Sequence, residues 1–332
     1  MKNINILVLG VGGNVSQGIV KAIKMPNLNC KIIGACVSED APGLYMCDKA
    51  YISPYASSID FIEWLIKICN SEKIDLIMTG VEEIIFTIAK NITDIEKKTN
   101  AIFVSSSLEK LRIGQDKLLT CEWLKKNGLN YPEFVPSKNF KLAESLFLDK
   151  GFPLIGKPRD GKGSNGIMII NNIEELKAVS DLDNYVIQEY IGNESSEYTI
   201  GCYCDNKGNL VDIIIMHRIL KQGTTHKATV VYDEVIYNEA KKICELFKPT
   251  GPLNIQLRLD KESRPVCFEL NVRFSGTTPM RAKFGYRDVE AQIYEYILNK
   301  DIQNLFDIKI GTAYRYLDEV YKMDSDNVTI NK

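Results

Sequence analysis

The segment 252–276 contains the side chains best suited to catalysis or metal binding, and polar and apolar residues alternate along two successive stretches of it. Side chains in a β-strand point alternately to opposite faces, so this spacing predicts two strands that each carry one polar face. Residues 261–264 have the length of an ordinary hairpin loop. With that loop, Gln256 lies opposite Glu269 and Asn254 lies opposite Asn271.

The predicted hairpin gathers oxygen ligands and positive charge on one face. That face carries Asn254, Gln256, Arg258 and Asp260 from the first strand and Cys267, Glu269, Asn271 and Arg273 from the second; the apolar side of the second strand carries Phe268, Leu270, Val272 and Phe274. Mg²⁺ prefers oxygen ligands and leaves positions open for phosphate. Arginine stabilises charge on a transferring phosphoryl group. The pattern suits a metal–phosphate site, although a solvated strand face would show the same alternation.

A glycine-rich stretch provides a second indication of phosphate chemistry. Residues 151–159 form a predicted strand with Lys157 near its end, residues 160–166 contain three glycines and a serine, and residues 167–170 form a second strand. Two strands joined by such a loop make a hairpin flap whose backbone N–H groups can close over phosphates. The flap is not a P-loop, because it lacks GxxxxGK[ST] and no helix follows. A flexible hairpin tip without a ligand is the alternative.

The N-terminal elements predict a Rossmann-like α/β domain. Residues 4–9 are an apolar run, interrupted only by Asn5, that ends in a glycine turn before a helix. Further strands are expected at residues 31–37 and 74–79, with helices at residues 59–70 and from Glu82. The turn sequence GVGGNV fits the dinucleotide fingerprint GxGxxG only in part. An NAD-dependent dehydrogenase therefore stays an alternative to glycines that only permit a tight turn and close packing.

Composition excludes several classes of protein. The chain has 332 residues, 45% hydrophobic content and a formal net charge of −2, as expected for a globular protein with more than one domain. Nucleic-acid binding is not expected without a basic run. We expect no membrane span and no secretory signal. Nine cysteines without metal-type spacing fit reduced thiols and a cytoplasmic protein.

Taken in order, these motifs resemble the ATP-grasp superfamily, most closely its carbamoyl phosphate synthetase large-subunit and biotin carboxylase branch. The resemblance covers roughly residues 1–300 and is carried by Lys117 in QDKLLT, Lys157 in IGKPRDGKGSNG, QEYI at 188–191, Gln256 in NIQ and FELNVRFSG from 268. It implies a Rossmann-like domain at 1–108 and a two-subdomain ATP-grasp fold. The small subdomain with the flap would span 109–185, the large subdomain with the hairpin 186–302, and a C-terminal extension 303–332.

The resemblance also implies roles for individual residues. ATP would be bound by Lys117, Lys157, Gly161, Gly163, Ser164, Gly166, Glu189, Tyr190, Ile191 and Glu197, with the residues at 189–191 at the adenine and Glu197 at the ribose. Mg²⁺, or Mn²⁺ in its place, would be held by Gln256, Glu269 and Asn271. Arg273 would be catalytic and steady the reacting oxygens. Many members of the superfamily have a carboxylate where this chain has Gln256.

The implied reaction is ATP-dependent ligation. A substrate carboxylate attacks the γ-phosphate of ATP to give an acylphosphate and ADP, and an amine then displaces phosphate. The expected partners are small carboxylate and amine substrates, and a homodimer is left open. Glu82, Glu83, Arg218, Lys221 and His226 are candidates for the substrate pocket. The alternatives are carboxyphosphate or carbamate chemistry within the superfamily, and outside it the dehydrogenase or a non-catalytic nucleotide-binding regulator.

Overall fold

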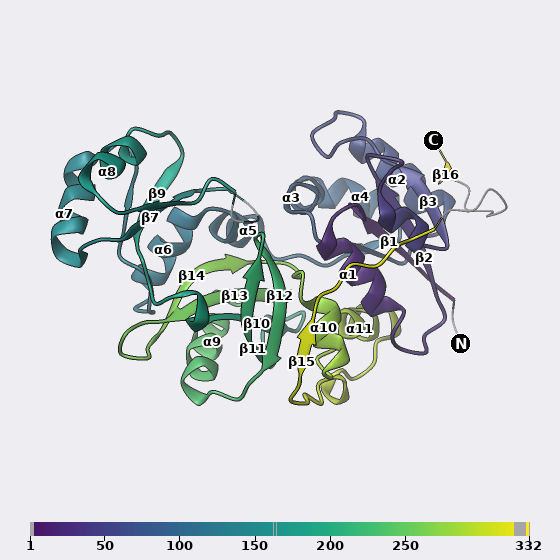
Figure 1. Ribbon diagram of the computed structural model, residues 1–332. Helices are drawn as coiled ribbons and strands as arrows, with labels where there is room; N and C mark the ends of the chain where they lie inside the picture. The colour runs from purple at the N-terminus through teal and green to yellow at the C-terminus, as the bar shows by residue number, and fades with distance from the viewer. Residues whose placement is uncertain (1–2, 162, 164, 322–329, 332) are drawn as a thin grey trace.

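The computed structural model describes residues 3–161, 163, 165–321 and 330–331, and within these residues the chain forms three β-sheets (Figure 1). A parallel sheet lies in the N-terminal part, a four-stranded antiparallel sheet lies at the opposite end of the molecule, and a six-stranded antiparallel sheet lies between them. The mixed α/β and α+β fold class predicted from the sequence is confirmed.

The N-terminal sheet has the strand order β16-β3-β2-β1-β4-β5, and all of its pairs are parallel. Its strands are β1 (Ile4–Leu9), β2 (Cys30–Cys36), β3 (Lys49–Ile52), β4 (Leu76–Thr79), β5 (Ile102–Phe103) and β16 (Ile330–Asn331). Helices cover both faces of a parallel sheet, which explains why β1 is apolar except at Asn5 and is almost completely buried. The strands predicted at residues 4–9, 31–37 and 74–79 are present.

The helices of this part are α1 (Asn14–Ile23), α2 (Phe61–Ser71), α3 (Glu82–Lys90), α4 (Ile92–Lys98) and α5 (Leu108–Gln115). The glycine turn before α1 serves close packing: Gly10 has a φ of +69°, and a Cβ on Gly12 would lie 2.9 Å from the Cys36 sulfur. Gly18, within α1, allows a similar approach, because a Cβ there would lie 2.9 Å from Pro279. The N-terminal part therefore packs directly on the rest of the chain.

The four-stranded sheet has the order β6-β9-β7-β8 and contains the flap. Its strands are β6 (Phe134–Pro136), β7 (Leu154–Pro158), β8 (Met168–Ile170) and β9 (Tyr185–Glu189), and α7 (Phe140–Lys150) and α8 (Ile173–Ser180) pack on it. The flap is the connection between β7 and β8. Nearby α6 (Lys117–Lys126) begins after Asp116, whose carboxylate accepts hydrogen bonds from the N–H groups of Leu118 and Leu119 and so caps the helix.

The six-stranded sheet has the order β14-β13-β10-β11-β12-β15. Its strands are β10 (Glu197–Cys204), β11 (Leu210–Lys221), β12 (Thr224–Val230), β13 (Gly251–Leu259), β14 (Pro265–Asn271) and β15 (Thr312–Tyr314). Helix α9 (Glu234–Phe247) covers one face, and α10 (Thr278–Lys283) and α11 (Asp288–Gln292) lie between the sheet and α1. The polar residues of the predicted hairpin lie on the face away from α9.

The hairpin of β13 and β14 has the predicted pairing at the site but not along its whole length. Gln256 pairs with Glu269 and Asn254 pairs with Asn271, as predicted. The register then shifts, so that Leu257 pairs with Cys267. Because of this β-bulge, the residues that precede Glu269 on β14 face the side of the sheet opposite to the one predicted by simple alternation. The predicted facing of two residues is therefore wrong: Cys267 is buried in the core under α9, and Phe268 lines a cleft on the polar face.

The C-terminal segment adds a strand to the six-stranded sheet and another to the N-terminal sheet. β15 pairs with β12 at the edge of the six-stranded sheet, and β16 pairs with β3 in the N-terminal sheet (yellow in Figure 1). The domain boundaries given above stay predictions; β9, which straddles the boundary at residue 185, pairs with β6 and β7.

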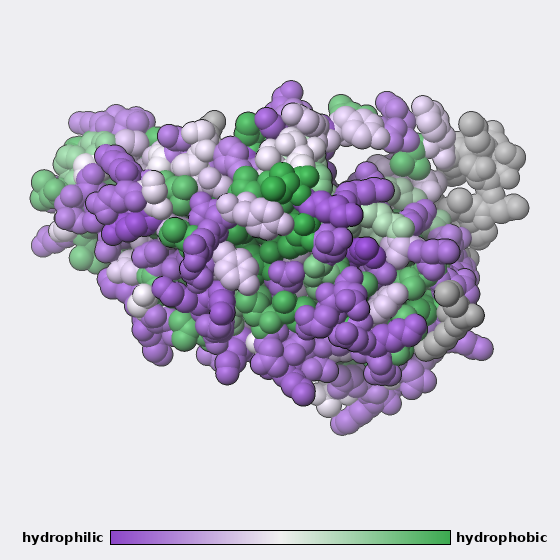
Figure 2. Space-filling view, turned by 90° about the horizontal axis from the view of Figure 1, so that it is seen from below, coloured by the Kyte–Doolittle hydropathy of each residue, from purple (hydrophilic) through white to green (hydrophobic). Residues whose placement is uncertain are grey.

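The surface seen from below is mostly hydrophilic, with smaller apolar areas near its centre (Figure 2). This is expected when most large apolar side chains are buried in the cores. None of the helices in the described residues is long and apolar enough to cross a membrane.

Candidate active site

Two clefts open on the polar face of the six-stranded sheet. The first, between this sheet and the four-stranded sheet, has an empty volume of about 780 Å³ and is called the nucleotide cleft below. The second, between this sheet and the start of α1, has an empty volume of about 1380 Å³ and is called the second cleft. Both clefts are lined by Lys117, Gly161, Gly163, Arg218, Leu220, Gln256 and Glu269. These shared residues form the junction of the two clefts.

Strand alternation sets the order of residues along this face. Arg258 lines only the nucleotide cleft, Gln256 lines both clefts, and Asn254 lines only the second cleft. On β14, Glu269 lines both clefts and Asn271 only the second. Side chains two residues apart on a strand lie about 6–7 Å apart on the same face. Of the predicted metal ligands, Gln256 and Glu269 therefore lie at the junction, and Asn271 lies two residues further along β14, in the second cleft.

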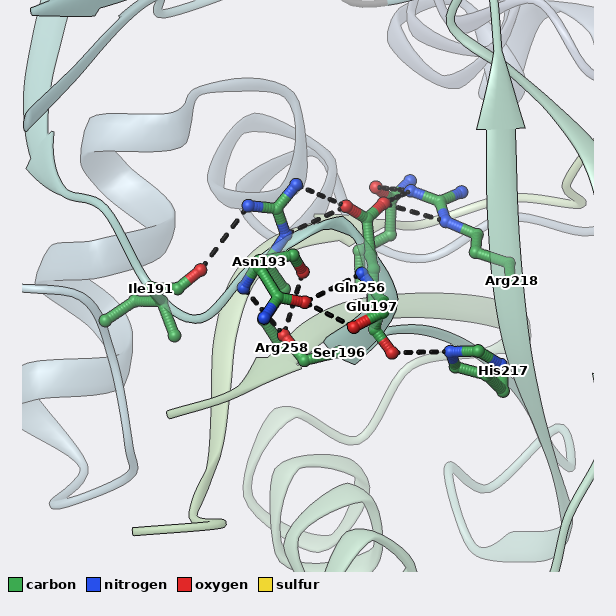
Figure 3. A network of polar contacts seen from close by, with 9 residues as sticks. Ile191, Asn193, Ser196, Glu197, His217, Arg218, Gln256 and Arg258 are labelled. Atoms are coloured by element: carbon green, nitrogen blue, oxygen red, sulfur yellow. Dashed lines mark hydrogen bonds and ion pairs between the residues drawn. The ribbon is translucent and has the colours of Figure 1, made fainter. Parts of the chain in front are cut away.

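Glu197 is held between two arginines in the nucleotide cleft (Figure 3). One carboxylate oxygen accepts a 2.9 Å hydrogen bond from Arg218 Nε, and the other accepts hydrogen bonds of 2.9 and 2.7 Å from Arg258 Nε and Nη2. Burial alone would raise the pKa of Glu197, but the two guanidinium groups outweigh it and lower the pKa. Both oxygens of the predicted ribose ligand are thus already engaged by arginine.

Gln256 is joined to the same cluster. Its Oε1 accepts a 2.7 Å hydrogen bond from Arg218 Nη2, so Arg218 bridges Glu197 and Gln256 (Figure 3). Arg258 also donates a long hydrogen bond, 3.4 Å, to the carbonyl of Ile191. Arg258 thus links the six-stranded sheet to the segment after β9, where the family resemblance places the adenine.

The three residues predicted at the adenine line the nucleotide cleft together. Glu189 accepts a weak 3.4 Å hydrogen bond from the Glu133 N–H, and Tyr190 places its ring 5.3 Å from the Arg258 guanidinium carbon. Ile191 is buried. Their roles at the adenine stay predictions.

Lys157 lies beside Glu269 and over an aromatic ring. Its ammonium is 4.6 Å from the centre of the Phe268 ring, the residue that the bulge turns into the cleft. Burial lowers the pKa of Lys157 to about 8, and the nearby Glu269 carboxylate opposes this shift. A buried ammonium that faces an open cleft is suited to an anionic ligand such as phosphate.

Lys117 and the flap meet at the junction. Lys117 Nζ donates a 2.8 Å hydrogen bond to the Gly161 carbonyl, and Arg159 Nε lies 3.1 Å from both Asp116 oxygens at the base of the flap. The flap also touches the turn between β11 and β12, because a Cβ on Gly223 would lie 2.3 Å from the Gly163 carbonyl oxygen.

One predicted flap residue, Gly166, lies outside both clefts. It adopts a φ of +72°, and its carbonyl accepts a 3.0 Å hydrogen bond from the Tyr185 hydroxyl. Ser164 lies outside the described residues.

Arg273 lies in the second cleft and not in the nucleotide cleft. Its Nε and Nη2 lie 2.9 and 2.8 Å from Glu82 Oε1 on α3, and Nη2 also donates a 2.8 Å hydrogen bond to Asn271 Oδ1. Asn271 Nδ2 is buried and has no hydrogen-bond partner. The proposed catalytic arginine is thus oriented by a residue of the N-terminal part.

Of the other residues predicted for the substrate pocket, Arg218 also lines the second cleft, and Glu83, Lys221 and His226 line neither cleft.

The oxygen ligands at the junction and next to it fit a divalent cation held jointly with phosphate. Among the described residues, no group of three or more His, Cys, Asp or Glu is placed to hold a metal by itself. The Glu269 carboxylate takes part in none of the hydrogen bonds or ion pairs between described side chains, and the amide oxygens of Gln256 and Asn271 each accept one hydrogen bond from arginine. One free carboxylate and two amide oxygens leave several positions for phosphate and water, as Mg²⁺ requires.

Sequence reasoning missed several residues of the site. Arg258 was placed on the correct face by alternation but given no role, and Phe268 was placed on the wrong face. Arg315 lines the second cleft from a segment without any recognised motif. Its position follows from the pairing of β15 with β12, which no local pattern indicates.

Comparison with known proteins identifies the family. Residues 114–277 match the model of an ATP-grasp domain, and residues 6–103 match that of a PylC-like N-terminal domain. A curated relative, the carbamoyl phosphate synthase large chain of Campylobacter jejuni, is 24% identical over 71% of this chain and 23% of its own length. The chain thus spans about a quarter of that relative.

Two solved structures share the fold. The biotin carboxylase domain of 2-oxoglutarate carboxylase from Hydrogenobacter thermophilus, in complex with MgADP and bicarbonate, has a TM-score of 0.69 and 17% identity over 93% of this chain and 73% of that one. An L-amino acid ligase from Bacillus licheniformis has a TM-score of 0.68 and 16% identity over 93% and 78%. The two domain matches thus identify an ATP-grasp domain at residues 114–277, preceded by a PylC-like N-terminal domain at residues 6–103.

Proposed function

We propose that this protein is an ATP- and Mg²⁺-dependent ligase that joins a carboxylate substrate to an amine through an acylphosphate and releases ADP and phosphate. The observation that carries the proposal is the junction of the two clefts. A cleft lined by buried cations meets a larger cleft at Lys117, Gln256 and Glu269. A nucleotide in the first cleft can therefore present its terminal phosphate to a substrate in the second.

The residues at the junction and beside it match the charge changes of this reaction. A carboxylate oxygen attacks the γ-phosphorus while the bond to the β-phosphate oxygen breaks and ADP leaves. The amine nitrogen then attacks the acyl carbon, the phosphate leaves with its bonding electrons, and the nitrogen loses a proton. Lys157 and Lys117 would neutralise phosphate charge, and Arg273 would steady the carboxylate. A Mg²⁺ ion, or Mn²⁺, held by Glu269 with Gln256 and Asn271 would supply further charge neutralisation.

The similar structures support this choice without deciding the substrate. One is an L-amino acid ligase, and another is a biotin carboxylase domain in complex with MgADP and bicarbonate. Carboxyphosphate or carbamate chemistry is the second candidate, because the carbamoyl phosphate synthase large chain is a relative. Without the open solvent at its mouth, the second cleft still has a volume of about 390 Å³, more than bicarbonate needs, which favours an organic acid or amine.

The cellular setting is part of the proposal. All nine cysteines are free, and eight of them are buried, which fits a reducing compartment such as the cytoplasm. The assembly proposed is a homodimer, which gel filtration with light scattering would test.

Two measurements test the proposed function. Thermal-shift titration should show stabilisation by Mg-ATP and none by NADH, since only a ligand that binds the folded state raises its stability. ADP release should then depend on an acid and an amine together, with mass spectrometry to identify the product. ADP release with bicarbonate alone would select the second candidate, and stabilisation by NADH but not by Mg-ATP would refute both.

A further inference from the structure

Arg315 is a cation in the second cleft that no acidic group neutralises within the described residues. It follows β15, and three hydrogen bonds hold it. Its Nε donates to the Thr225 carbonyl at 2.9 Å, its Nη2 to the Gly276 carbonyl at 2.6 Å, and its backbone N–H to the His226 carbonyl at 2.7 Å. These contacts fix the guanidinium in place and leave its positive charge without a carboxylate.

The other guanidinium groups of this cleft differ from Arg315 in their partners. Arg218 forms an ion pair with Glu197, and Arg273 forms one with Glu82. Arg315 is half-buried, and burial lowers its pKa. An arginine still keeps its charge near neutral pH, so this one is partly desolvated without a counter-ion. A bound anion would provide the missing charge.

The start of α1 lies beside Arg315 and also lacks a partner. A Cβ on Gly276 would lie 3.2 Å from Asn14 Nδ2 and 3.8 Å from Arg315 Nη2, so these two side chains meet at Gly276. Helix α1 has no side-chain cap and no acidic residue in its first turn. Residues 13–16 line the second cleft. Free N–H groups at a helix N-terminus favour a negative charge.

A third group points to a ligand in the same cleft. The Asn271 side chain lines it, is 4% exposed, and carries an Nδ2 without a hydrogen-bond partner. A buried donor of this kind is normally satisfied. Arg315, Asn14 and Gly276 line the second cleft alone and lie outside the junction. An anion at Arg315 is therefore separate from the group that receives phosphate.

We propose that Arg315 and the first turn of α1 bind a carboxylate that is not phosphorylated, so that the substrate of the second cleft is an amino acid or a similar two-ended acid. This inference rests on the proposed function and specifies its substrate class. A singly charged carboxylate matches one unpaired guanidinium. A phosphate monoester carries more charge, and the only lysine that lines this cleft in the described residues, Lys117, is hydrogen-bonded to Gly161.

The test compares Arg315→Gln and Arg315→Lys with wild type, and Arg264→Gln serves as control. Arg264 is an exposed arginine, paired with Asp260 in the hairpin loop and outside both clefts. The probes are the common L-amino acids, their α-carboxamides and inorganic phosphate. Binding is measured by calorimetry without ATP, and turnover by ADP release with Mg-ATP. A thermal melt of each variant reports on folding.

Arg315→Gln should weaken binding of the amino acid and lower its kcat/KM by about 10- to 100-fold, the effect of losing one charge-assisted hydrogen bond. The KM for ATP should stay unchanged, the carboxamide should bind equally to both proteins, and Arg315→Lys should recover part of the loss. Equal losses for acid and carboxamide would overturn the carboxylate role and leave the ligase intact. Phosphate binding that needs Arg315, without amino-acid binding, would also overturn it. Amino-acid binding that needs Arg315 without any ADP release would instead refute the ligase.

Discussion

Lys157 carries a cost in stability that a role in ATP binding would explain. Its side chain is buried, and burial lowers its pKa from 10.5 to about 8. At about 1.4 kcal/mol for each unit between these two values, keeping this lysine charged in the folded protein costs about 3 kcal/mol at pH 7. The cation–π contact with Phe268 offsets part of this cost, by about 2 kcal/mol for a desolvated ammonium.

Lys157→Met removes the charge and keeps a long apolar side chain. We expect the free energy of unfolding at pH 7 to rise by about 1–3 kcal/mol, while affinity for Mg-ATP falls sharply. The pH dependence has a definite sign. Between pH 8 and 10.5 the unfolded chain holds a proton at Lys157 that the folded protein has lost, so the stability of wild type rises with pH in this window. The advantage of the variant is therefore full below pH 8 and disappears towards pH 10.5.

Urea unfolding at pH 7 and at pH 10, with thermal shifts in Mg-ATP, measures both effects. The matched control is Lys126→Met, in which an exposed lysine at the end of α6 is changed. It should alter the free energy of unfolding by no more than about 0.5 kcal/mol at either pH. A Lys157→Met variant less stable than wild type at pH 7, or with the same advantage at pH 10, would refute the assignment of a buried, costly charge.

The remaining predictions concern the carboxylates and the second-cleft arginine. Glu269→Gln should fold normally and lose Mg²⁺-dependent ADP release by orders of magnitude; activity within a few-fold of wild type across a Mg²⁺ titration would exclude the metal role. Glu197→Gln should destabilise the protein by about 3–5 kcal/mol at pH 7, because the two largely buried guanidinium groups of Arg218 and Arg258 lose their counter-ion. Since the pKa of Glu197 is lowered on folding, this contribution is present above about pH 4.5 and lost as the pH falls through the folded-state pKa, so unfolding at pH 7 and pH 3 should show the difference shrink. Arg273→Ala should leave Mg-ATP affinity near that of wild type and depress turnover, as ligand titration and ADP release will report; an equal loss of affinity would place this arginine on the nucleotide.

The pairing of the hairpin could be predicted because it depends on local information. Alternation gives the face of each residue and loop length gives the register, and together they place Gln256 opposite Glu269. The bulge could not be predicted, because one extra residue in a strand has no distinct sequence signature. It explains the error at Cys267 and Phe268, and it places an aromatic ring under the Lys157 ammonium.

Contacts between residues far apart in the sequence could not be predicted from local sequence patterns. Arg273 binds Glu82, which precedes it by 191 residues, and Arg315 binds the Thr225 carbonyl, 90 residues away. Such pairs depend on how α3 and β15 pack against the central sheet. The sequence could therefore identify both Arg273 and Glu82 as polar candidates without indicating that they meet.

The position of Gln256 shows how one sheet face borders both clefts. Along β13, each step of two residues moves about 6–7 Å, from Arg258 in the nucleotide cleft to Gln256 at the junction and Asn254 in the second cleft. A neutral amide at the middle position lets Arg218 bridge from Glu197 to Gln256. A carboxylate there would compete with Glu197 for that guanidinium and would face Glu269 across the strands, where like charges repel. The arginine cluster and the neutral residue at 256 are thus two parts of one charge arrangement, which leaves Glu269 as the negative group at the junction.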